Sequence, residues 1–306
     1  MPVLVNPSLA GPLDDQFRLM VSNRQQWASV ANPYKTTAAV FDFKLTKKKA
    51  KGGYVGVALS FFTDKAGDLQ MGTTKGDFSL AYHAIIDRKN TFSGGLQVGL
   101  RQQSINFANM KWGTQYNGDT YDATMPSGEN LMSSFIAYDL GQGVCWHSRP
   151  LSNLRFNVGL AMLHAFRSYV SYYDAEFVRQ YRKIILHGDA LVKVKGTNSA
   201  ILPEVQYIRQ GPNQEITVGA LQMIGVKPAA QITGFIKGTN VLYGMHYRVG
   251  DAVIASVGFD HAGYSIRFSY DMNASKLKAS SNYKGGYEIS LRFTNPKSFY
   301  YSKAKF

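Results

Sequence analysis

Hydrophobic residues recur at every second position along most of the chain. In the stretch GGYEISLRF (285–293), four large apolar residues alternate with Glu288, Ser290 and Arg292. Successive side chains of a β-strand point to opposite faces, so this spacing predicts a strand with one apolar and one polar face. The same alternation recurs in residues 54–62, 78–86, 92–102, 154–162 and 264–272.

Fourteen segments follow this pattern, most of them about 9 to 11 residues long, which is the length of a tilted strand that crosses a bilayer. Lipid cannot satisfy backbone N–H and C=O groups, so strands span a membrane only when the sheet closes on itself. We therefore predict an all-β fold: a closed antiparallel transmembrane β-barrel of about 14 strands, of the outer-membrane type. The segments lie near residues 15–23, 36–45, 53–62, 75–86, 91–103, 134–146, 153–164, 182–194, 198–209, 214–224, 240–249, 251–259, 263–272 and 285–293.

The last segment shows how the two faces would be used. Tyr287 and Phe293 bracket it and are expected at the two bilayer interfaces, while its charged face points into the lumen. The polar faces of other segments carry Gly56, Gly99 and Gly159, which leave room inside the barrel or permit local twist. A soluble β-sandwich shows the same alternation but would need its aromatic-rich faces to pack together.

The spaces between segments alternate in length. Short turns on one side and long loops on the other are typical of outer-membrane barrels, and an even strand number places both chain ends on one side. Two places break the rule: residues 225–239 are long where a turn is due and could hold a further strand near 230–236, and RVGD (248–251) is short where a loop is due. The spaces on the loop side are mostly long, at 24–35, 63–74, 104–133, 165–181, 210–213 and 273–284, and those on the turn side mostly short, at 46–52, 87–90, 147–152, 195–197 and 260–262.

This pattern divides the chain into three parts. Residues 1–14 form an N-terminal segment, residues 15–293 the barrel, and residues 294–306 a tail that lies in the periplasm if the short turns do. Both termini are thus expected on the periplasmic side.

Composition excludes several classes of protein. Aromatic residues make up 13% of the chain and charged residues 18%, with a mean hydropathy of −0.19, as expected when polar and apolar residues alternate. No apolar run approaches the roughly 18 residues of a transmembrane helix. The opening residues MPVLVNPSLAG do not read as a signal peptide, so the protein is either cytoplasmic or a mature or trimmed form. The single Cys145 excludes an internal disulfide and occupies an ordinary strand position.

The formal net charge of +14 raises the question of an anionic partner. Lysines cluster in short stretches between segments, at 46–53 and 276–286, and not along one helix. Basic turns beside anionic head groups, such as outer-membrane lipid or lipopolysaccharide, or simply solvated turns, explain this better than nucleic acid. A soluble basic β-protein that binds nucleic acid remains the third hypothesis, and it predicts salt-sensitive binding without detergent.

No catalytic, metal or cofactor site is predicted. Among the six histidines, three lie inside predicted segments (His83, His187 and His246) and three at segment ends (His147, His164 and His261). No carboxylate or second histidine stands at ligand spacing, and no serine has a nucleophile-elbow motif. The stretch TDKAGD (63–68) lacks the full ligand series of a cation loop and is interpreted as a turn. We therefore expect a protein that is not an enzyme.

The long loops are the interaction candidates. Phe107, Trp112, Tyr116 and Tyr121 lie in the longest loop and are of the types that anchor interfaces, although they could equally plug the barrel mouth or pack on one another. In residues 166–183, Tyr172 and Tyr173 precede a basic run that could meet a partner or lipid phosphates. For these residues an aromatic girdle at the membrane surface is the favoured alternative.

Eight blocks of sequence, collinear from about residue 4 to residue 293, together resemble the PorP/SprF family of type IX secretion system membrane proteins from Bacteroidota. Each block alone is weak, whereas their joint occurrence is specific. Family members usually carry a signal peptide and a short aromatic-containing leader, which this chain does not display at its start. The blocks are LVNPSLAG (4–11), NRQQW (23–27), SFFTDKAGD (60–68), LAYHAIIDRKNTFSGGLQVGLRQQSINF (80–107), QGPNQEITVGAL (210–221), YRVGDAVIASVGF (247–259), SYDMNASKL (269–277) and GGYEISLRF.

The resemblance implies an outer-membrane barrel that binds the C-terminal sorting domain (type B) of a secreted protein. Such a barrel would support export and surface anchoring of that protein, for example a gliding adhesin, together with other type IX secretion components. The alternative is an outer-membrane diffusion channel or small-molecule transporter, which many barrels of this size are. A lumen filled by side chains would argue against a channel.

Overall fold

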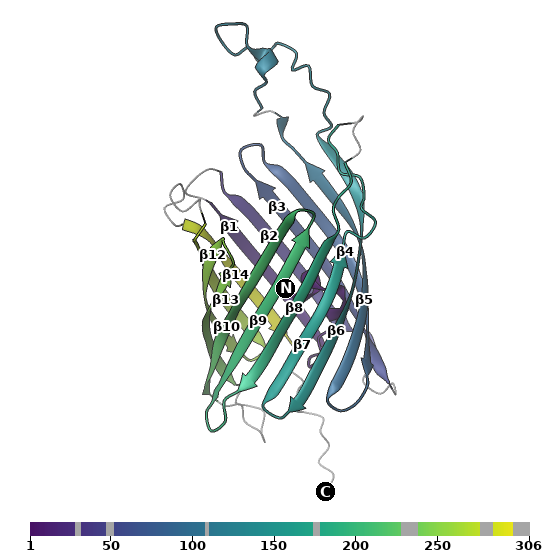
Figure 1. Cartoon of the computed structure of the whole chain (residues 1–306), viewed down its shortest axis with the longest axis vertical. Helices are drawn as coiled ribbons and strands as arrows, with labels where there is room; N and C mark the ends of the chain where they lie inside the picture. The colour runs from purple at the N-terminus through teal and green to yellow at the C-terminus, as the bar shows by residue number, and fades with distance from the viewer. Residues whose placement is uncertain are drawn as a thin grey trace.

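The protein is a closed barrel of 14 antiparallel strands (Figure 1). The computed structural model describes residues 1–27, 32–46, 52–107, 110–173, 178–227, 238–275 and 284–295. Each strand pairs with its neighbours in the chain, and β1 pairs with β14, which confirms the predicted fold and strand number. The strands are β1 Phe17–Gln26, β2 Tyr34–Lys44, β3 Gly53–Ala66, β4 Met71–Ile85, β5 Asn90–Ser104, β6 Ser134–Leu151, β7 Leu154–Leu163, β8 Lys183–Lys193, β9 Ser199–Gln210, β10 Asn213–Lys227, β11 Thr239–Arg248, β12 Ala252–His261, β13 Tyr264–Asn273 and β14 Lys284–Thr294.

In the part of the chain that the structure describes, no helix has the length and apolar character needed to cross a membrane.

The two faces of the wall differ as the alternation predicts. On β5, Leu96 and Val98 are more than half exposed on the outer surface, whereas Ser93, Gln97 and Arg101 are buried on the inner one. Similar outward apolar side chains line every strand and would be costly to leave in water, so this surface is suited to lipid. The polar inner side chains are shielded from lipid by the wall itself.

The closing pair follows the same rule. Leu291 of β14 lies opposite Val21 of β1, and both point outward. Glu288 lies opposite Arg24 on the polar face. Phe293 packs against Phe17 at the end of the strand, with ring centroids 5.7 Å apart. The charged side of the terminal strand therefore faces the lumen, as predicted.

The two ends of the barrel are unlike. We call the end with connections such as 86–89, 152–153 and 262–263 the turn end, and the opposite one the loop end. The connections 105–133 and 164–182 make the loop end long, and Figure 1 shows the first of them rising well beyond the strands. β1 starts and β14 ends at the turn end, which confirms that the two ends of the barrel segment share a side.

Some predicted loops are strands. The prediction of a loop at 63–74 was wrong, because Thr63 pairs with Thr74 and Asp64 with Thr73, leaving only residues 67–70 as the connection. β6 likewise continues through the predicted turn at 147–152, ending at Leu151. These strand ends lie beyond the outward apolar residues of the wall. Backbone hydrogen bonds between the strands continue there, although the sequence no longer alternates between apolar and polar residues.

Other parts of the prediction lie outside the described residues. Residues 228–238 separate β10 from β11, but the structure describes only the last of them, so the expectation for 230–236 is untested. The tail is described only through Asn295. The short RVGD connection is confirmed, since β11 ends at Arg248 and β12 starts at Ala252.

Candidate functional site

The N-terminal residues lie inside the barrel. Residues 2–10, which we call the lumenal segment, form a short helix α1 (Pro2–Val5) and a 3-10 turn η1 (Pro7–Leu9), and Figure 1 places the N-terminus within the barrel wall's outline at mid-height. Proline suits the first position of each turn because its missing N–H would have no partner there. The side chain of Asn6 caps η1, with its Oδ1 accepting from the Ser8 backbone N–H (2.9 Å) and hydroxyl (2.7 Å).

The lumenal segment is packed and not merely enclosed. Val3 and Ala10 are fully buried and cluster with the inward side chains of Val40, Ala58 and Ala81. Ser8 is fully buried as well. These residues, which belong to the N-terminal segment of the predicted division, occupy the lumen.

Hydrogen bonds from the barrel wall hold the lumenal segment at Asn6 and at Ala10. The Nδ2 of Asn6 donates to the Val144 carbonyl (3.0 Å) and lies 3.0 Å from His187 Nε2. His83 Nε2 lies 2.7 Å from the Ala10 carbonyl oxygen. Buried polar groups need such partners, because each unpaired one destabilises the fold by about 1–3 kcal/mol.

An ion pair holds the exit of the lumenal segment. Asp42 is fully buried, and Arg18 donates to both of its oxygens, from Nε to Oδ1 (2.9 Å) and from Nη2 to Oδ2 (2.8 Å). The Gly11 N–H donates to Asp42 Oδ2 (3.0 Å), and Arg18 Nη2 also reaches the Leu9 carbonyl (3.3 Å). β1, β2 and the end of the segment are thus joined through one carboxylate.

Glycines on the inner wall make room for the lumenal segment. A Cβ on Gly56 would lie 2.0 Å from the Ala10 carbonyl oxygen, one on Gly95 2.5 Å from the Ser8 nitrogen, and one on Gly143 2.1 Å from Asn6 Oδ1. Real Cβ atoms essentially never approach so closely, so a larger residue at any of these positions would force the lumenal segment or its side chains to shift. The expectation that Gly56 and Gly159 leave room inside the barrel is met, since a Cβ on Gly159 would lie 2.8 Å from Asn6 Nδ2. A Cβ on Gly99 would instead meet Asp77 of the wall.

A chain of polar side chains continues from His83 along the wall. Ser93 Oγ lies 2.6 Å from His83 Nδ1 and 3.1 Å from His147 Nε2. His147 Nδ1 lies 2.8 Å from Asn157 Oδ1, and Asn157 Nδ2 donates to Asp189 Oδ2 (2.7 Å). Five neighbouring strands, β4 to β8, thereby contribute one side chain each to a continuous network.

This network is one hydrogen short when both imidazoles are neutral. The Ala10 carbonyl and the Asn157 oxygen accept only, so each must receive a hydrogen from its histidine. The single Ser93 hydroxyl hydrogen cannot then serve the second nitrogens of both rings. The Ser93 hydroxyl therefore donates to only one of the two rings.

The remaining histidines are placed singly. His187 and His246 lie inside strands, as predicted, whereas His147 lies within β6 and not at its end. His164 Nδ1 contacts Asp139 (2.9 Å) and His246 Nε2 lies 3.4 Å from Glu204, carboxylate partners that sequence spacing did not reveal. Among the described residues, no three His, Cys, Asp or Glu side chains form a group that could hold a metal ion.

The aromatic residues of loop 105–133 are brought together only in part. Tyr116 and Tyr121 form an isolated antiparallel bridge, with their rings edge to face at 5.7 Å. The Tyr121 hydroxyl donates to Gln115 Oε1 (3.2 Å), and Lys111 Nζ lies 5.1 Å from the Tyr121 ring centroid. Phe107 lies apart, near the base of the loop where β5 ends.

The tip of this loop has internal structure. Trp112 precedes a 3-10 turn, η3 (Gly113–Gln115), and its backbone N–H lies 3.3 Å from Gln115 Oε1. Gln115 is buried and donates from Nε2 to the Met125 carbonyl (2.8 Å). Tyr116 is 55% exposed. Because this tip rises away from the strands (Figure 1), it does not plug the barrel mouth.

Tyr172 and Tyr173 support the base of the same loop. The Tyr172 carbonyl accepts from the Met132 N–H (2.8 Å), and its ring packs edge to face on Phe135 at 5.0 Å. Burial raises the pKa of the Tyr172 hydroxyl. Tyr173 bridges to Leu131, and its hydroxyl donates to Glu129 (3.3 Å). Loops 105–133 and 164–182 are thus one connected structure.

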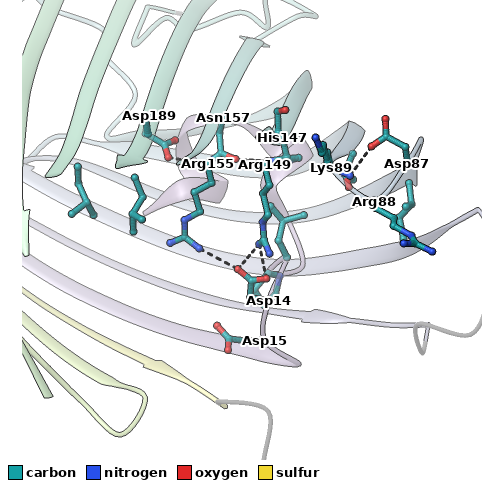
Figure 2. A pocket seen from close by; sticks show the side chains of 18 of the residues that line it. Asp14, Asp15, Asp87, Arg88, Lys89, His147, Arg149, Arg155, Asn157 and Asp189 are labelled. Atoms are coloured by element: carbon teal, nitrogen blue, oxygen red, sulfur yellow. Dashed lines mark hydrogen bonds and ion pairs between the residues drawn. The ribbon is translucent and has the colours of Figure 1, made fainter. Parts of the chain in front are cut away.

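Two cavities open at the turn end. The first, about 520 Å³, has acidic and basic side chains in its wall; Figure 2 shows Arg149 and Arg155 converging on Asp14 there. Arg149 Nη2 donates to both Asp14 oxygens (2.6 and 2.7 Å) and Arg155 Nη1 to one (3.3 Å). Burial raises the pKa of the neighbouring Asp15 carboxyl, and the negative charge of Asp14 adds to the effect.

The second cavity, about 470 Å³, adjoins the first and has a basic wall. Its charged lining residues are Lys89, Arg149, Arg155 and Lys193. The sequence indicates that the excess positive charge lies in turns but does not predict this cavity, because its cations come from three separate connections.

The position of residues 2–10 inside the lumen is likewise not predicted by the sequence pattern. Its signal is visible in hindsight: an Asn-Pro capping pair before the first strand, and glycines on the inner faces of adjacent strands. Neither feature says on its own that the one packs against the other.

Solved structures share this architecture at low sequence identity. The toluene transporter TbuX of Ralstonia pickettii matches with a TM-score of 0.52 and 8% identity, covering 95% of this chain and 92% of its own. A FadL homologue from Pseudomonas aeruginosa matches with a TM-score of 0.52, and the toluene transporter TodX of P. putida with 0.51, each at 8% identity and covering 95% of this chain and 93% of its own. These likenesses concern the fold alone. No curated protein matches the chain.

The family comparison is more specific. The family described as type IX secretion system membrane protein PorP/SprF matches residues 1–293, which includes the lumenal segment, β1 to β13 and all of β14 except Thr294. With its outward apolar surface and closed wall, the chain belongs to the PorP/SprF family of type IX secretion system membrane proteins and is an outer-membrane β-barrel.

Proposed function

We propose that this barrel holds a secreted protein at the cell surface by binding its C-terminal sorting domain (type B), and so supports export and anchoring, for example of a gliding adhesin. Membership of the secretion family makes contact with secretion components and cargo part of the protein's role. The specific cargo contact belongs to the proposal. The short turns are then periplasmic and the loop end extracellular, as in other outer-membrane barrels.

The organised tip of loop 105–133 is the observation that supports this function most. The buried amide of Gln115 orders the tip, while the ring of Tyr116 stays more than half exposed beside Tyr121. An aromatic ring presented on a rigid support loses little conformational entropy when it binds, which is what interface anchors require. Tyr172 and Tyr173 act in this scheme as supports of the loop base, with Trp112 and Phe107 as further contact candidates.

Co-purification tests the proposal. The full-length protein is extracted from its native cells in mild detergent, and the proteins that stay bound are identified by mass spectrometry. We expect a secreted protein with a C-terminal sorting domain. The proposal fails if no such protein is retained by the wild-type barrel, or if retention is unchanged in a Trp112→Ala/Tyr116→Ala variant.

The channel alternative is weakened by the lumenal segment. Val3, Asn6 and Ser8 are fully buried inside the wall of β3 to β6, where a pore would run. The resemblance to transporters is one of fold at 8% identity. We therefore favour the secretion role over a diffusion channel. A measurement of ion conductance distinguishes the two proposals.

A further inference from the structure

The basic cavity at the turn end is a candidate site beyond the cell-surface role. Its wall carries Lys89 from the β4–β5 turn, Arg149 and Arg155 from the β6–β7 connection and its flanks, and Lys193 at the end of β8. Among the residues that line it, all of them described, there is no carboxylate. Four cations around one cavity repel one another unless an anion is near.

Backbone hydrogen bonds fix the spacing of these cations. The Arg149 N–H donates to the Lys89 carbonyl (2.8 Å), and the Lys193 N–H donates to the Asn153 carbonyl (2.8 Å). The β4–β5 turn is itself held by Asp87, whose Oδ1 accepts from the backbone N–H groups of Lys89 and Asn90. These bonds, together with one from the Asn90 side chain, lower the pKa of the Asp87 carboxyl. Three neighbouring connections therefore form one pre-arranged surface.

The chain itself shows which anion this surface accepts. Asp14, just after the lumenal segment, receives two hydrogen bonds from Arg149 and one from Arg155, all through side-chain carboxylate oxygens. Arg149, Arg155 and Asp14 are each about half exposed, at 50%, 47% and 48%. A carboxylate is thus already bound to two of the four cations, and the other two face the same cavity.

The direction of the cationic side chains indicates from which side a ligand of the basic cavity approaches. Arg155 and Lys193 alternate with the outward residues Val158 and Ile184 of their strands, so they lie on the inner face. Arg149 and Arg155 meet Asp14, whose segment comes from the lumen (Figure 2). Arg149, Arg155 and Lys193 thus point toward the mouth of the barrel and away from the bilayer, a position for a segment that approaches along the barrel axis. Lipid head groups lie beside the outer face.

The apolar residues in the wall of the basic cavity indicate which class of anionic ligand fits it. Leu151, Leu154 and Leu191 also line the basic cavity. A ligand with both carboxylates and apolar side chains would contact both parts of the wall, whereas a small inorganic anion would use only the cations.

We infer that the basic cavity at the turn end binds an acidic peptide segment of a partner protein, whose carboxylates pair with Lys89 and Lys193 and compete with Asp14 for Arg149 and Arg155. This is a second interface, at the end of the barrel opposite loop 105–133. It stands independently of the sorting-domain contact, because its test involves no secreted cargo.

The test uses the full-length protein in detergent and a fluorescein-labelled peptide of alternating Glu and Ser with interspersed Leu, followed by fluorescence anisotropy. The same peptide with Gln in place of Glu measures the part that depends on charge. We expect binding of the Glu peptide, weaker binding as salt is raised, and little binding of the Gln peptide. Equal binding of the two peptides, or no binding of either, overturns the inference.

Variants locate the site. Lys89→Gln/Lys193→Gln removes two exposed cations that hold no part of the fold, and should weaken Glu-peptide binding about three- to tenfold. Lys35→Gln/Arg209→Gln removes the same charge from exposed positions at the loop end and should leave binding unchanged. A matching loss in both double variants would mean that only net charge matters, and would overturn the site.

Asp14→Asn distinguishes competition from a structural role. If Asp14 occupies part of the peptide's site, its neutralisation frees two arginines and the Glu peptide binds several-fold more tightly. Weaker or unchanged binding contradicts competition.

Micelles that contain anionic phosphatidylglycerol form the last arm of the test. If phosphatidylglycerol binds, if Lys89→Gln/Lys193→Gln weakens its binding, and if the Glu peptide fails to bind, the surface is a lipid site and the inference is wrong.

Discussion

The imidazole of His83, on the wall of the barrel, lies 2.7 Å from the carbonyl oxygen of Ala10, at the end of the segment inside it. This contact joins two parts of the chain that are 73 residues apart and fixes the tautomer of the ring, since the carbonyl can only accept. It shows that the segment and the wall form one hydrogen-bonded unit.

His83→Phe should destabilise the barrel by about 1–3 kcal/mol, because the buried Ala10 carbonyl loses its partner while the aromatic stack on Tyr54 is kept. The measurement is urea unfolding in detergent followed by tryptophan fluorescence. His261→Phe is the control, since His261 is exposed at the end of β12 and its Nδ1 contacts the Thr239 hydroxyl of the neighbouring strand. Equal effects in the two variants would contradict the role of the Ala10 contact.

Gly95→Ala should displace the lumenal segment, because the added Cβ would lie 2.5–2.6 Å from backbone atoms of Pro7 and Ser8, which cannot move as a flexible side chain could. We expect a loss of about 1–3 kcal/mol and faster proteolysis of the N-terminal residues. Gly94→Ala is matched in sequence and faces open space on the other side of the strand. An unchanged cleavage rate in Gly95→Ala would show that the segment does not need this glycine.

Asp42→Asn should destabilise the protein by about 3 kcal/mol, since it removes the charge from a fully buried group that holds Arg18 and the Gly11 N–H. The comparison is Asp14→Asn, whose ion pairs with Arg149 and Arg155 are half exposed and should contribute less than about 1 kcal/mol. Thermal unfolding of both variants in the same detergent decides the matter. Similar shifts would mean that burial does not set the strength of the Asp42 pair.

Removal of residues 2–10 should increase ion conductance in planar bilayers relative to the full chain, because the deletion empties the part of the lumen beside β3 to β6. A full-length protein that already conducts as well as the deletion variant would support the channel alternative and contradict a lumen obstructed by the segment.

Tyr116→Ala should reduce retention of a sorting-domain protein about tenfold or more, if the exposed ring is an interface anchor. Tyr138→Ala is the matched control: its side chain is 73% exposed, more than that of Tyr116, but lies on the barrel wall below the loop. Quantitative mass spectrometry of co-purified proteins gives the ratio. Equal losses in both variants would point to a general effect of aromatic surface.

The sequence by itself determined the wall of this protein. The side chains of a strand alternate between its two faces whatever the rest of the chain does. Tyr287, Ile289 and Leu291 alternate with Glu288 and Ser290. This spacing was enough to predict a sheet with one apolar and one polar face. Backbone groups in lipid must be paired within the sheet, so closure into a barrel followed. These are local or general constraints, readable from one segment at a time.

Only the tertiary structure decided what fills and caps that wall. The approach of Asn6 to Gly143, the contact of Ala10 with His83 and the convergence of Lys89 and Lys193 on one cavity each join residues from separate strands or turns. Their positions depend on the register of strand pairs and on the path of the N-terminal residues, which no periodicity encodes. Strand ends beyond the apolar belt, as at Asp64, were decided in the same way, because backbone pairing there continues without an apolar pattern.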